Sequence, residues 1–230
     1  MTLYGVELVR AEDAEEVASI VADALVDAAR GGRAIALTGG RSPGRSYELA
    51  AKREPDWGAA SVWWGDERCV PPEDDRSNYR LAAGTLLERL AVQPREVQRI
   101  RGELGAEAAA RDYDAKLTGV ELGFVLLGLG PDGHVASLFP NQATLEERGR
   151  RAIPAEARLE PLVDRVTMTV PVLCSAPEVV FVLTGEEKAD AVERAFARPP
   201  NPDTPGSLIR SAGGRTRVVA DAAALSRLLA

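Results

Sequence analysis

The sequence has few of the residues that form metal sites and disulfides. Its 230 residues include one histidine and two cysteines, Cys69 and Cys174, which lie far apart in the chain. A structural zinc site needs about four nitrogen or sulfur ligands, commonly from closely spaced cysteine and histidine pairs. We therefore expect neither a structural metal site nor a disulfide, and we expect both cysteines to be reduced and non-catalytic.

Lysine is also scarce, and the net charge is negative. The formal net charge is −7, and the chain contains only three lysines, Lys52, Lys116 and Lys188, although arginine is abundant. Proteins that bind nucleic acid neutralise its phosphates with a basic surface. Nucleic acid is therefore not an expected partner.

Long apolar runs are missing. The first residues carry no basic segment followed by an apolar core, and no run approaches the roughly 20 residues of a membrane span. We expect a cytoplasmic protein that does not associate with a membrane. The length suits one α/β domain over residues 1–230, and a monomer or a weak dimer is our expectation for its assembly.

Residues 122–140 form the most informative stretch, an apolar strand that runs into a glycine-rich loop. The strand covers residues 124–127, and the loop carries Asp132 and His134. Histidine is the side-chain type whose unperturbed pKa lies near neutrality, so His134 is the natural candidate for proton transfer. Asp132 could orient its imidazole or share its proton. The alternative is a solvated or capping histidine, which is the commoner role of a lone loop histidine.

The same loop matches a dinucleotide fingerprint. Gly128, Gly130 and Gly133 satisfy G-x-G-x-x-G after a strand. That fingerprint also requires a long helix after the third glycine and an acidic residue about 20 positions later. Here Pro140 stops any helix within about two turns, so we do not expect NAD.

Strand and helix patterns alternate along the chain. Strands are predicted over residues 33–37, 61–65, 97–100, 124–127, 165–170, 178–184 and 216–220. Helices are predicted over residues 13–30, 77–90, 106–117, 185–198 and 221–229, with another beginning after Ser42. Residues 141–163 show no sustained period and are predicted to be a surface excursion. The pattern predicts an α/β fold, a mainly parallel Rossmann-like sheet with helices on both faces.

The turn after the first predicted strand is a candidate anion site. It contains Gly39, Gly40, Arg41 and Ser42, and Ser42 is placed to cap the following helix. A glycine-rich turn from strand to helix presents free backbone N–H groups at the positive end of the helix dipole. An ordinary tight turn explains the pattern equally well.

Three further charged residues lie where open α/β sheets bind ligands. Asp66 and Arg68 follow a predicted strand, and Lys188 lies in the first turn of a predicted helix. Charge clusters are usually solvated, and a lysine usually lies on the surface. A cation at the mouth of the sheet is nevertheless well placed for an anionic ligand.

Four motifs together resemble the 6-phosphogluconolactonase family, which shares its fold with glucosamine-6-phosphate deaminases. In order they are Thr-Gly-Gly-Arg-Ser-Pro, Gly-Asp-Glu-Arg, Gly-Pro-Asp-Gly-His and Thr-Gly-x-x-Lys. The resemblance implies hydrolysis of a phosphosugar lactone, 6-phosphoglucono-1,5-lactone, without a cofactor or metal. It implies His134 and Asp132 as catalytic residues. It also implies substrate and phosphate binding by Gly39, Gly40, Arg41, Ser42, Asp66, Arg68 and Lys188.

The sequence departs from the family pattern at Arg41, where a small hydroxyl residue is usual, so Arg41 either contacts phosphate or points to solvent. Two rival functions are a glucosamine-6-phosphate deaminase and a non-catalytic sugar-phosphate sensor. Ala-Ser-Leu-Phe-Pro after His134 favours the lactonase over the deaminase. A sensor would ordinarily carry a helix-turn-helix, whereas the α/β pattern accounts for all 230 residues here. No G-x-S-x-G is present, which favours direct attack by water over an acyl-enzyme.

Overall fold

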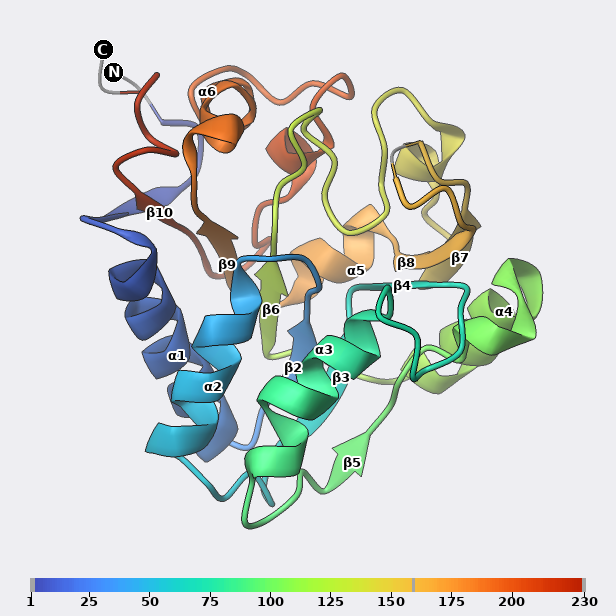
Figure 1. Cartoon of the computed structure of the whole chain (residues 1–230). Coiled ribbons are helices and arrows are strands. Elements are labelled where there is room, and N and C mark those ends of the chain that lie inside the picture. The colour runs from blue at the N-terminus through green and yellow to red at the C-terminus, as the bar shows by residue number, and fades with distance from the viewer. Residues whose placement is uncertain (1–2, 159, 229–230) are drawn as a thin grey trace.

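The computed structural model describes residues 3–158 and 160–228, and its centre is a seven-stranded parallel sheet (Figure 1). The strand order is β1-β10-β9-β6-β2-β3-β5. The strands are Glu7–Ala11 (β1), Ala34–Leu37 (β2), Ser61–Trp64 (β3), Glu96–Val97 (β5), Phe124–Leu127 (β6), Glu178–Leu183 (β9) and Arg215–Asp221 (β10). The predicted mainly parallel sheet is confirmed.

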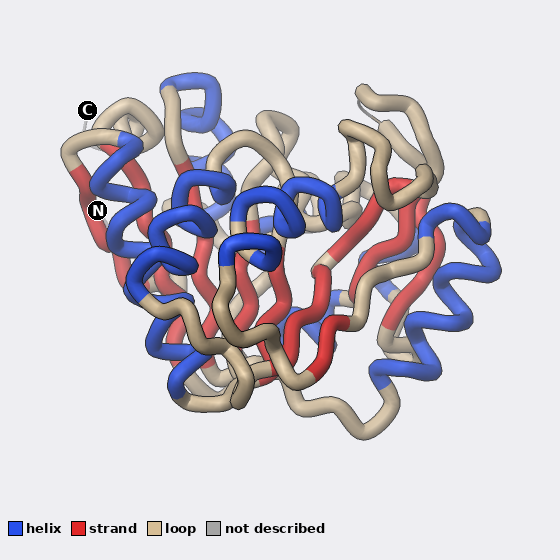
Figure 2. Tube along the Cα trace, turned by 60° about the horizontal axis from the view of Figure 1, so that its bottom comes forward, coloured by secondary structure: helices blue, strands red, loops and turns tan. Residues whose placement is uncertain are grey.

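Helices cover both faces of this sheet, as predicted (Figures 1 and 2). One face carries α1 (Ala14–Arg30), α2 (Pro43–Arg53) and α3 (Asn78–Thr85), and the other carries α5 (Val170–Ser175) and α6 (Ala189–Phe196). After β2 the chain adds strands toward the β5 edge, and right-handed crossovers place the connecting helices on one face. After β6 it adds strands toward the β1 edge, and the same handedness places the connecting helices on the other face. The strand order therefore reverses between β2 and β6.

A second, antiparallel sheet lies beside the first and was not predicted. Its order is β4-β8-β7, from Asp66–Arg68 (β4), Arg165–Met168 (β8) and Ala152–Ala155 (β7), and α4 (Ala106–Leu117) packs against it. Asp66 and Arg68, expected only to follow a strand, lie in a strand of their own, and the predicted surface excursion contains β7. Both strands form by pairing with β8, which lies about 100 residues from β4 in the sequence, so no local pattern indicates β4.

The core is formed by the central strands and aromatic side chains around them. Trp63 and Trp64 are both buried, as expected for packing residues. The Trp63 ring lies 6.0 Å from that of Tyr113, and Trp64 lies 5.4 Å from Tyr79. The Tyr113 hydroxyl donates to the Trp64 carbonyl oxygen at 3.0 Å, so the buried phenol keeps a partner.

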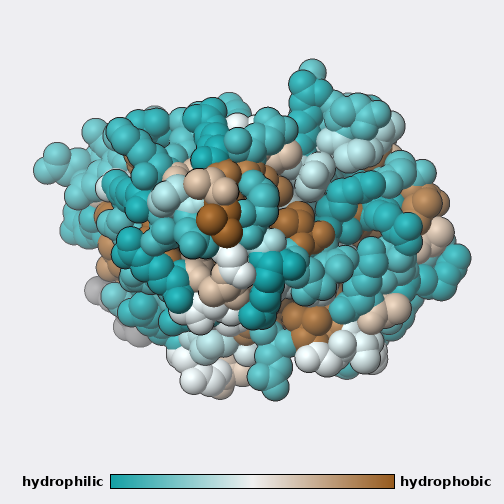
Figure 3. All heavy atoms as spheres, turned by 90° about the horizontal axis from the view of Figure 1, so that it is seen from below, coloured by the Kyte–Doolittle hydropathy of each residue, from teal (hydrophilic) through white to brown (hydrophobic). Residues whose placement is uncertain are grey.

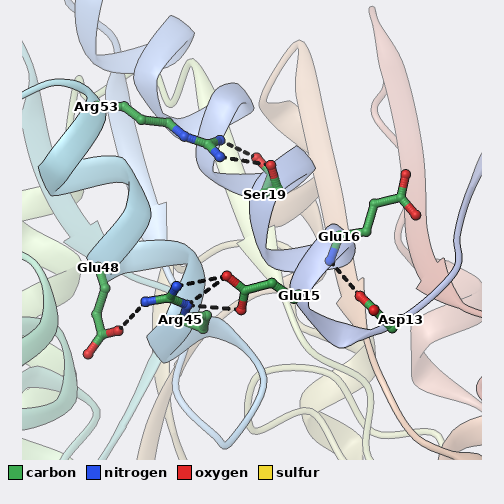
Figure 4. Close-up of polar contacts among 7 residues, drawn as sticks. All are labelled: Asp13, Glu15, Glu16, Ser19, Arg45, Glu48 and Arg53. Atoms are coloured by element: carbon green, nitrogen blue, oxygen red, sulfur yellow. Dashed lines mark hydrogen bonds and ion pairs between the residues drawn. The ribbon is translucent and has the colours of Figure 1, made fainter.

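Contacts between α1 and α2 fix the start of α2 (Figure 4). Asp13 caps α1 by accepting from the Glu16 backbone N–H at 2.9 Å. Arg45 of α2 lies between Glu15 and Glu48, with nitrogen–oxygen distances of 2.7 and 3.0 Å. These exposed pairs contribute little by themselves, but they orient a helix whose first turn follows the candidate anion loop.

Several predicted boundaries are wrong. The predicted helix over 221–229 is a series of turns through residue 228, and residue 229 lies outside the described residues. There the Asp221 carboxylate accepts from the backbone N–H groups of Gly185 and Ala224. The predicted helix over 77–90 ends at Thr85 and continues as the 3₁₀ turn Leu87–Arg89, and β1 was not predicted.

The face opposite the carboxyl ends of the strands is largely hydrophilic. Seen from below, apolar atoms show there only in small separate groups (Figure 3). Within residues 3–158 and 160–228, no helix combines the length and the apolar character needed to cross a bilayer.

Candidate active site

A cavity of about 160 Å³ opens where the strand order reverses between β2 and β6. Loops leaving these neighbouring strands turn to opposite faces of the sheet, which leaves a crevice at the carboxyl ends of the strands. Eight of the nine predicted site residues line it: Gly39, Gly40, Arg41, Ser42, Asp66, Arg68, His134 and Lys188. The ninth, Asp132, is not a lining residue but is hydrogen-bonded to His134. The structure thus brings the predicted residues together, while their roles stay predictions.

His134 and Asp132 form a hydrogen-bonded pair beside the cavity. The distance from His134 Nδ1 to Asp132 Oδ1 is 2.6 Å, and the same oxygen accepts from the His134 backbone N–H at 3.1 Å. The imidazole packs against Phe139, with ring centroids 4.8 Å apart. The first and last of these contacts hold the ring itself, and the backbone contact holds the Asp132 carboxylate in place beside it.

The Asp132 carboxylate determines the imidazole tautomer. Burial alone would raise the pKa of Asp132, but its hydrogen bond with His134 and the charge there outweigh burial and leave that pKa below its usual value. A carboxylate can only accept, so His134 Nδ1 carries the proton and donates it to Asp132. Nε2 of a neutral His134 then holds a free lone pair and can act as a base.

Two glycines make this loop geometry possible. A Cβ atom at Gly130 would lie 2.0 Å from His134 Nδ1 and 2.6 Å from Asp132 Oδ1. Gly133 has a φ of +94°, and a Cβ there would lie 2.7 Å from the Thr204 methyl group. Side chains at these positions are excluded by contact at the first and by both contact and conformation at the second.

The loop after β2 presents unpaired backbone N–H groups. Within the described part of the chain, no hydrogen bond is donated by the main-chain nitrogens of Gly39, Gly40, Arg41 or Ser42. The predicted side-chain cap by Ser42 is wrong, because its hydroxyl instead pairs with that of Thr184 at 2.9 Å. The N–H groups at the start of α2 therefore remain available to an anion.

Lys188 is half-buried at the boundary between a 3₁₀ turn, Glu186–Lys188, and α6. Burial lowers the pKa of Lys188, and the positive charge of Arg41 lowers it further against the opposite effect of Glu187. Its ammonium group has no hydrogen bond or ion pair with any described residue. A half-buried ammonium without a partner is poised to bind an anionic ligand.

A buried polar network forms the wall nearest the second sheet. Asp66 accepts from the Ser137 hydroxyl at 2.5 Å and from the Asn78 side-chain amide at 3.0 Å. Glu67 accepts from the backbone N–H groups of Asn78 and Tyr79, both at 2.7 Å. Glu67 thereby fixes the start of α3, and with it the position of Asn78 beside Asp66.

Among the cavity residues that were not predicted as site residues are two with a side-chain amide or a charge, Asn78 and Arg165. Asn78 is buried, and Arg165 pairs in register with Arg68 across β4 and β8. Both lie in segments that resemble the family, Ser77-Asn78-Tyr79 and the stretch beginning Arg165-Val166-Thr167. These resemblances were the available signal, but residue type alone did not distinguish either residue from a structural one.

The two cysteines lie outside the cavity. Burial, with the charges of Asp164 and Glu67, raises the pKa of Cys69 to about 11, and burial also raises that of Cys174. Both are free thiols that stay protonated at neutral pH. We expect the Cys69→Ser/Cys174→Ser double variant to retain its turnover rate within about threefold, as measured by steady-state kinetics. A larger loss in a variant with an unchanged melting temperature would contradict this assignment.

Comparison with known proteins identifies the family. The family model for glucosamine-6-phosphate isomerases/6-phosphogluconolactonase matches residues 9–218. A 6-phosphogluconolactonase of Streptomyces coelicolor is 33% identical over 237 residues, which cover 94% of this chain and 90% of the relative. One of Rhizobium meliloti is 38% identical over 193 residues, 80% of this chain and 81% of the relative.

The fold agrees with these sequence matches. The solved structure of 6-phosphogluconolactonase from Trypanosoma cruzi superimposes with a TM-score of 0.87 at 24% identity, covering all of this chain and 99% of the other. The resemblance to 6-phosphogluconolactonases is thus confirmed. The chain belongs to the family of glucosamine-6-phosphate isomerases and 6-phosphogluconolactonases.

Proposed function

We propose that this protein hydrolyses 6-phosphoglucono-1,5-lactone to 6-phosphogluconate, a step of the oxidative pentose phosphate pathway. The relatives described above carry the name of this activity. The observation that carries the proposal is that one cavity holds both an aspartate-oriented imidazole and a loop of free N–H groups beside Lys188. The first suits activation of water, and the second suits the substrate phosphate.

In the proposed mechanism, neutral His134 removes a proton from the attacking water through Nε2. The water oxygen bonds to C1 of the lactone, and the bond from C1 to the ring oxygen then breaks. The imidazolium returns its proton to the departing ring oxygen, so the base is regenerated. Asp132 stabilises the imidazolium and holds the ring in place, and no covalent intermediate with the protein is required.

The substrate is held at two ends of the cavity. We assign the 6-phosphate to the 39–42 loop, Arg68 and Lys188, which supply N–H groups and positive charge. Asp66 is assigned to a sugar hydroxyl, because its buried carboxylate faces the cavity and can accept a further hydrogen bond.

The family description also names isomerases, so the substrate test has two arms. The purified protein is mixed with the lactone, and acid release is followed in a pH-stat against spontaneous hydrolysis. It is separately mixed with glucosamine 6-phosphate, and ammonia is measured. The proposal predicts acid release well above the spontaneous rate and no ammonia. Ammonia release without lactone hydrolysis would replace the proposal with the deaminase reaction.

Asp132 is proposed to orient the base and not to be the base. Asp132→Asn keeps an acceptor oxygen for His134 but removes the negative charge that stabilises the imidazolium. Loss of one such charge interaction should destabilise the transition state by about 1.4 kcal/mol, so we expect kcat to fall by roughly tenfold. Steady-state kinetics measure this. A fall as large as that caused by removing His134 would identify Asp132 as the base.

We further propose a cytoplasmic protein that is a monomer or a weak dimer and does not bind nucleic acid. Among the described residues, the exposed large apolar side chains are few: Tyr4, Val92, Val97, Leu104 and Leu162. Stable dimers usually bury a more apolar interface.

A further inference from the structure

A second cavity, of about 340 Å³, adjoins the first and shares Arg41, Ser42 and Lys188 with it. Its wall also includes Glu187 and Asp221. Two loops therefore meet at the candidate phosphate site: residues 38–42 after β2 and residues 184–188 after β9. The contacts between these loops determine which charges an incoming phosphate meets.

Two side-chain contacts join the loops. The inner one pairs the Ser42 and Thr184 hydroxyls at 2.9 Å. The outer one is an ion pair between Arg41 Nη2 and Glu187 Oε1 at 3.1 Å. The Arg41 side chain is 89% exposed and that of Glu187 53% exposed. Arg41 thus lines both cavities, yet its guanidinium is directed to solvent and to Glu187.

The conformation of Gly185 lets Glu187 reach Arg41. Gly185 has a φ of +93°, and a Cβ atom there would lie 2.3 Å from Glu187 Oε2. The carboxylate therefore folds back over the glycine, into space that a side chain at position 185 would occupy. Glu186, the preceding residue of the same turn, is also exposed but has no ion pair with any described residue.

We propose that Glu187 sets the affinity of the phosphate site by competing with the substrate phosphate for Arg41. The inference rests on the proposed function only in placing the phosphate at the 39–42 loop. When a phosphate occupies the loop beside Lys188, Arg41 exchanges the carboxylate for the phosphate, which carries more charge and accepts two parallel N–H bonds. When product leaves, Glu187 pairs with Arg41 again and so assists release.

A double-mutant cycle tests the exchange. Binding of inorganic phosphate is measured by calorimetry at low ionic strength for wild type, Glu187→Gln, Arg41→Gln and the double variant. We expect Glu187→Gln to bind phosphate about two- to fivefold more tightly, the range of an exposed ion pair. Arg41→Gln should bind about tenfold more weakly, as expected for loss of a charge-assisted contact. The double variant should match Arg41→Gln.

Glu186→Gln is the matched control, because it removes the same charge from the same turn without affecting Arg41. It should bind phosphate within about twofold of wild type. An equal gain in phosphate affinity in Glu186→Gln would overturn the exchange, and so would a gain from Glu187→Gln that persists in the Arg41→Gln background. Either result would mean that the carboxylates act only by general repulsion of phosphate. No gain in Glu187→Gln, or no phosphate binding by wild type, would overturn it as well. Lactone hydrolysis by wild type, measured in parallel, tests the proposed function separately.

Discussion

Replacing His134 with alanine is expected to lower kcat for lactone hydrolysis by about 10²- to 10⁴-fold, the usual cost of losing a general base. The reason is structural as well as chemical. His134 is the only histidine in the chain, and it lines the cavity with Nδ1 bonded to Asp132 at 2.6 Å. Stopped-flow or pH-stat kinetics, corrected for spontaneous hydrolysis, measure the change.

Two controls separate a lost base from a disrupted site. His134→Ala should bind inorganic phosphate as wild type does, since Lys188 and the 39–42 loop are unchanged. His134→Gln keeps a polar side chain of similar reach but cannot take the proton, so it should lose as much activity as His134→Ala. Near wild-type turnover in either variant would leave the reaction standing but remove His134 from its mechanism.

The pH dependence follows from the same assignment. Only a neutral imidazole accepts a proton, so kcat/KM should rise with pH and then level off. The pKa of Asp132 is lowered, so its carboxylate is already ionised at the start of this rise. The rise should therefore follow a single group. Its absence in wild type, or its persistence in His134→Gln, would contradict the assignment.

Replacing Lys188 with alanine is expected to raise KM for the phosphorylated lactone by about tenfold to a hundredfold. A charge-assisted contact contributes roughly 1.5–3 kcal/mol, which corresponds to that range. Lys188 is half-buried and lines both adjoining cavities. Since the lysine would contact a part of the substrate remote from the reacting carbon, kcat should change less than KM.

Unphosphorylated glucono-1,5-lactone provides the matched control for Lys188. Its slow hydrolysis should be the same in wild type and in Lys188→Ala, because there is no phosphate for the ammonium to bind. Lys116→Ala, on α4, removes a lysine that pairs with Asp112 away from the cavity and should change neither reaction. An equal loss with both lactones would show that Lys188 supports the fold of the site and not phosphate binding.

Local patterns predicted those parts of the molecule whose structure is determined locally. The strand Phe124–Leu127 and the helix Ala106–Leu117 have the predicted bounds, since one is a continuous apolar run and the other is followed by a stop at Thr118-Gly119. The loops at the carboxyl ends of the strands could also be placed, because parallel strands bring them to one edge. That geometry explains why residues that follow β2, β3, β6 and β9 line one cavity.

Structure that depends on distant partners was missed. Among the described residues, the strand Glu7–Ala11 pairs on one side only, and it is partly exposed, so its apolar signal is weak. The strand Asp66–Arg68 consists of three charged residues, and its pairing partner lies about 100 residues away in the sequence. Arg165 lies in this second sheet, and Asn78, at the start of α3, is held beside it by hydrogen bonds to Asp66. Their place in the site therefore could not be derived from spacing along the chain.

The most direct test of this account compares kcat/KM of the wild-type protein for 6-phosphoglucono-1,5-lactone and for glucono-1,5-lactone under the same conditions. If one cavity joins a histidine base to a phosphate site, the phosphorylated lactone should be hydrolysed with a kcat/KM larger by about 10²-fold or more, equivalent to two charged contacts. Equal values for the two lactones, or no acceleration of the phosphorylated one above its spontaneous hydrolysis, would contradict the account.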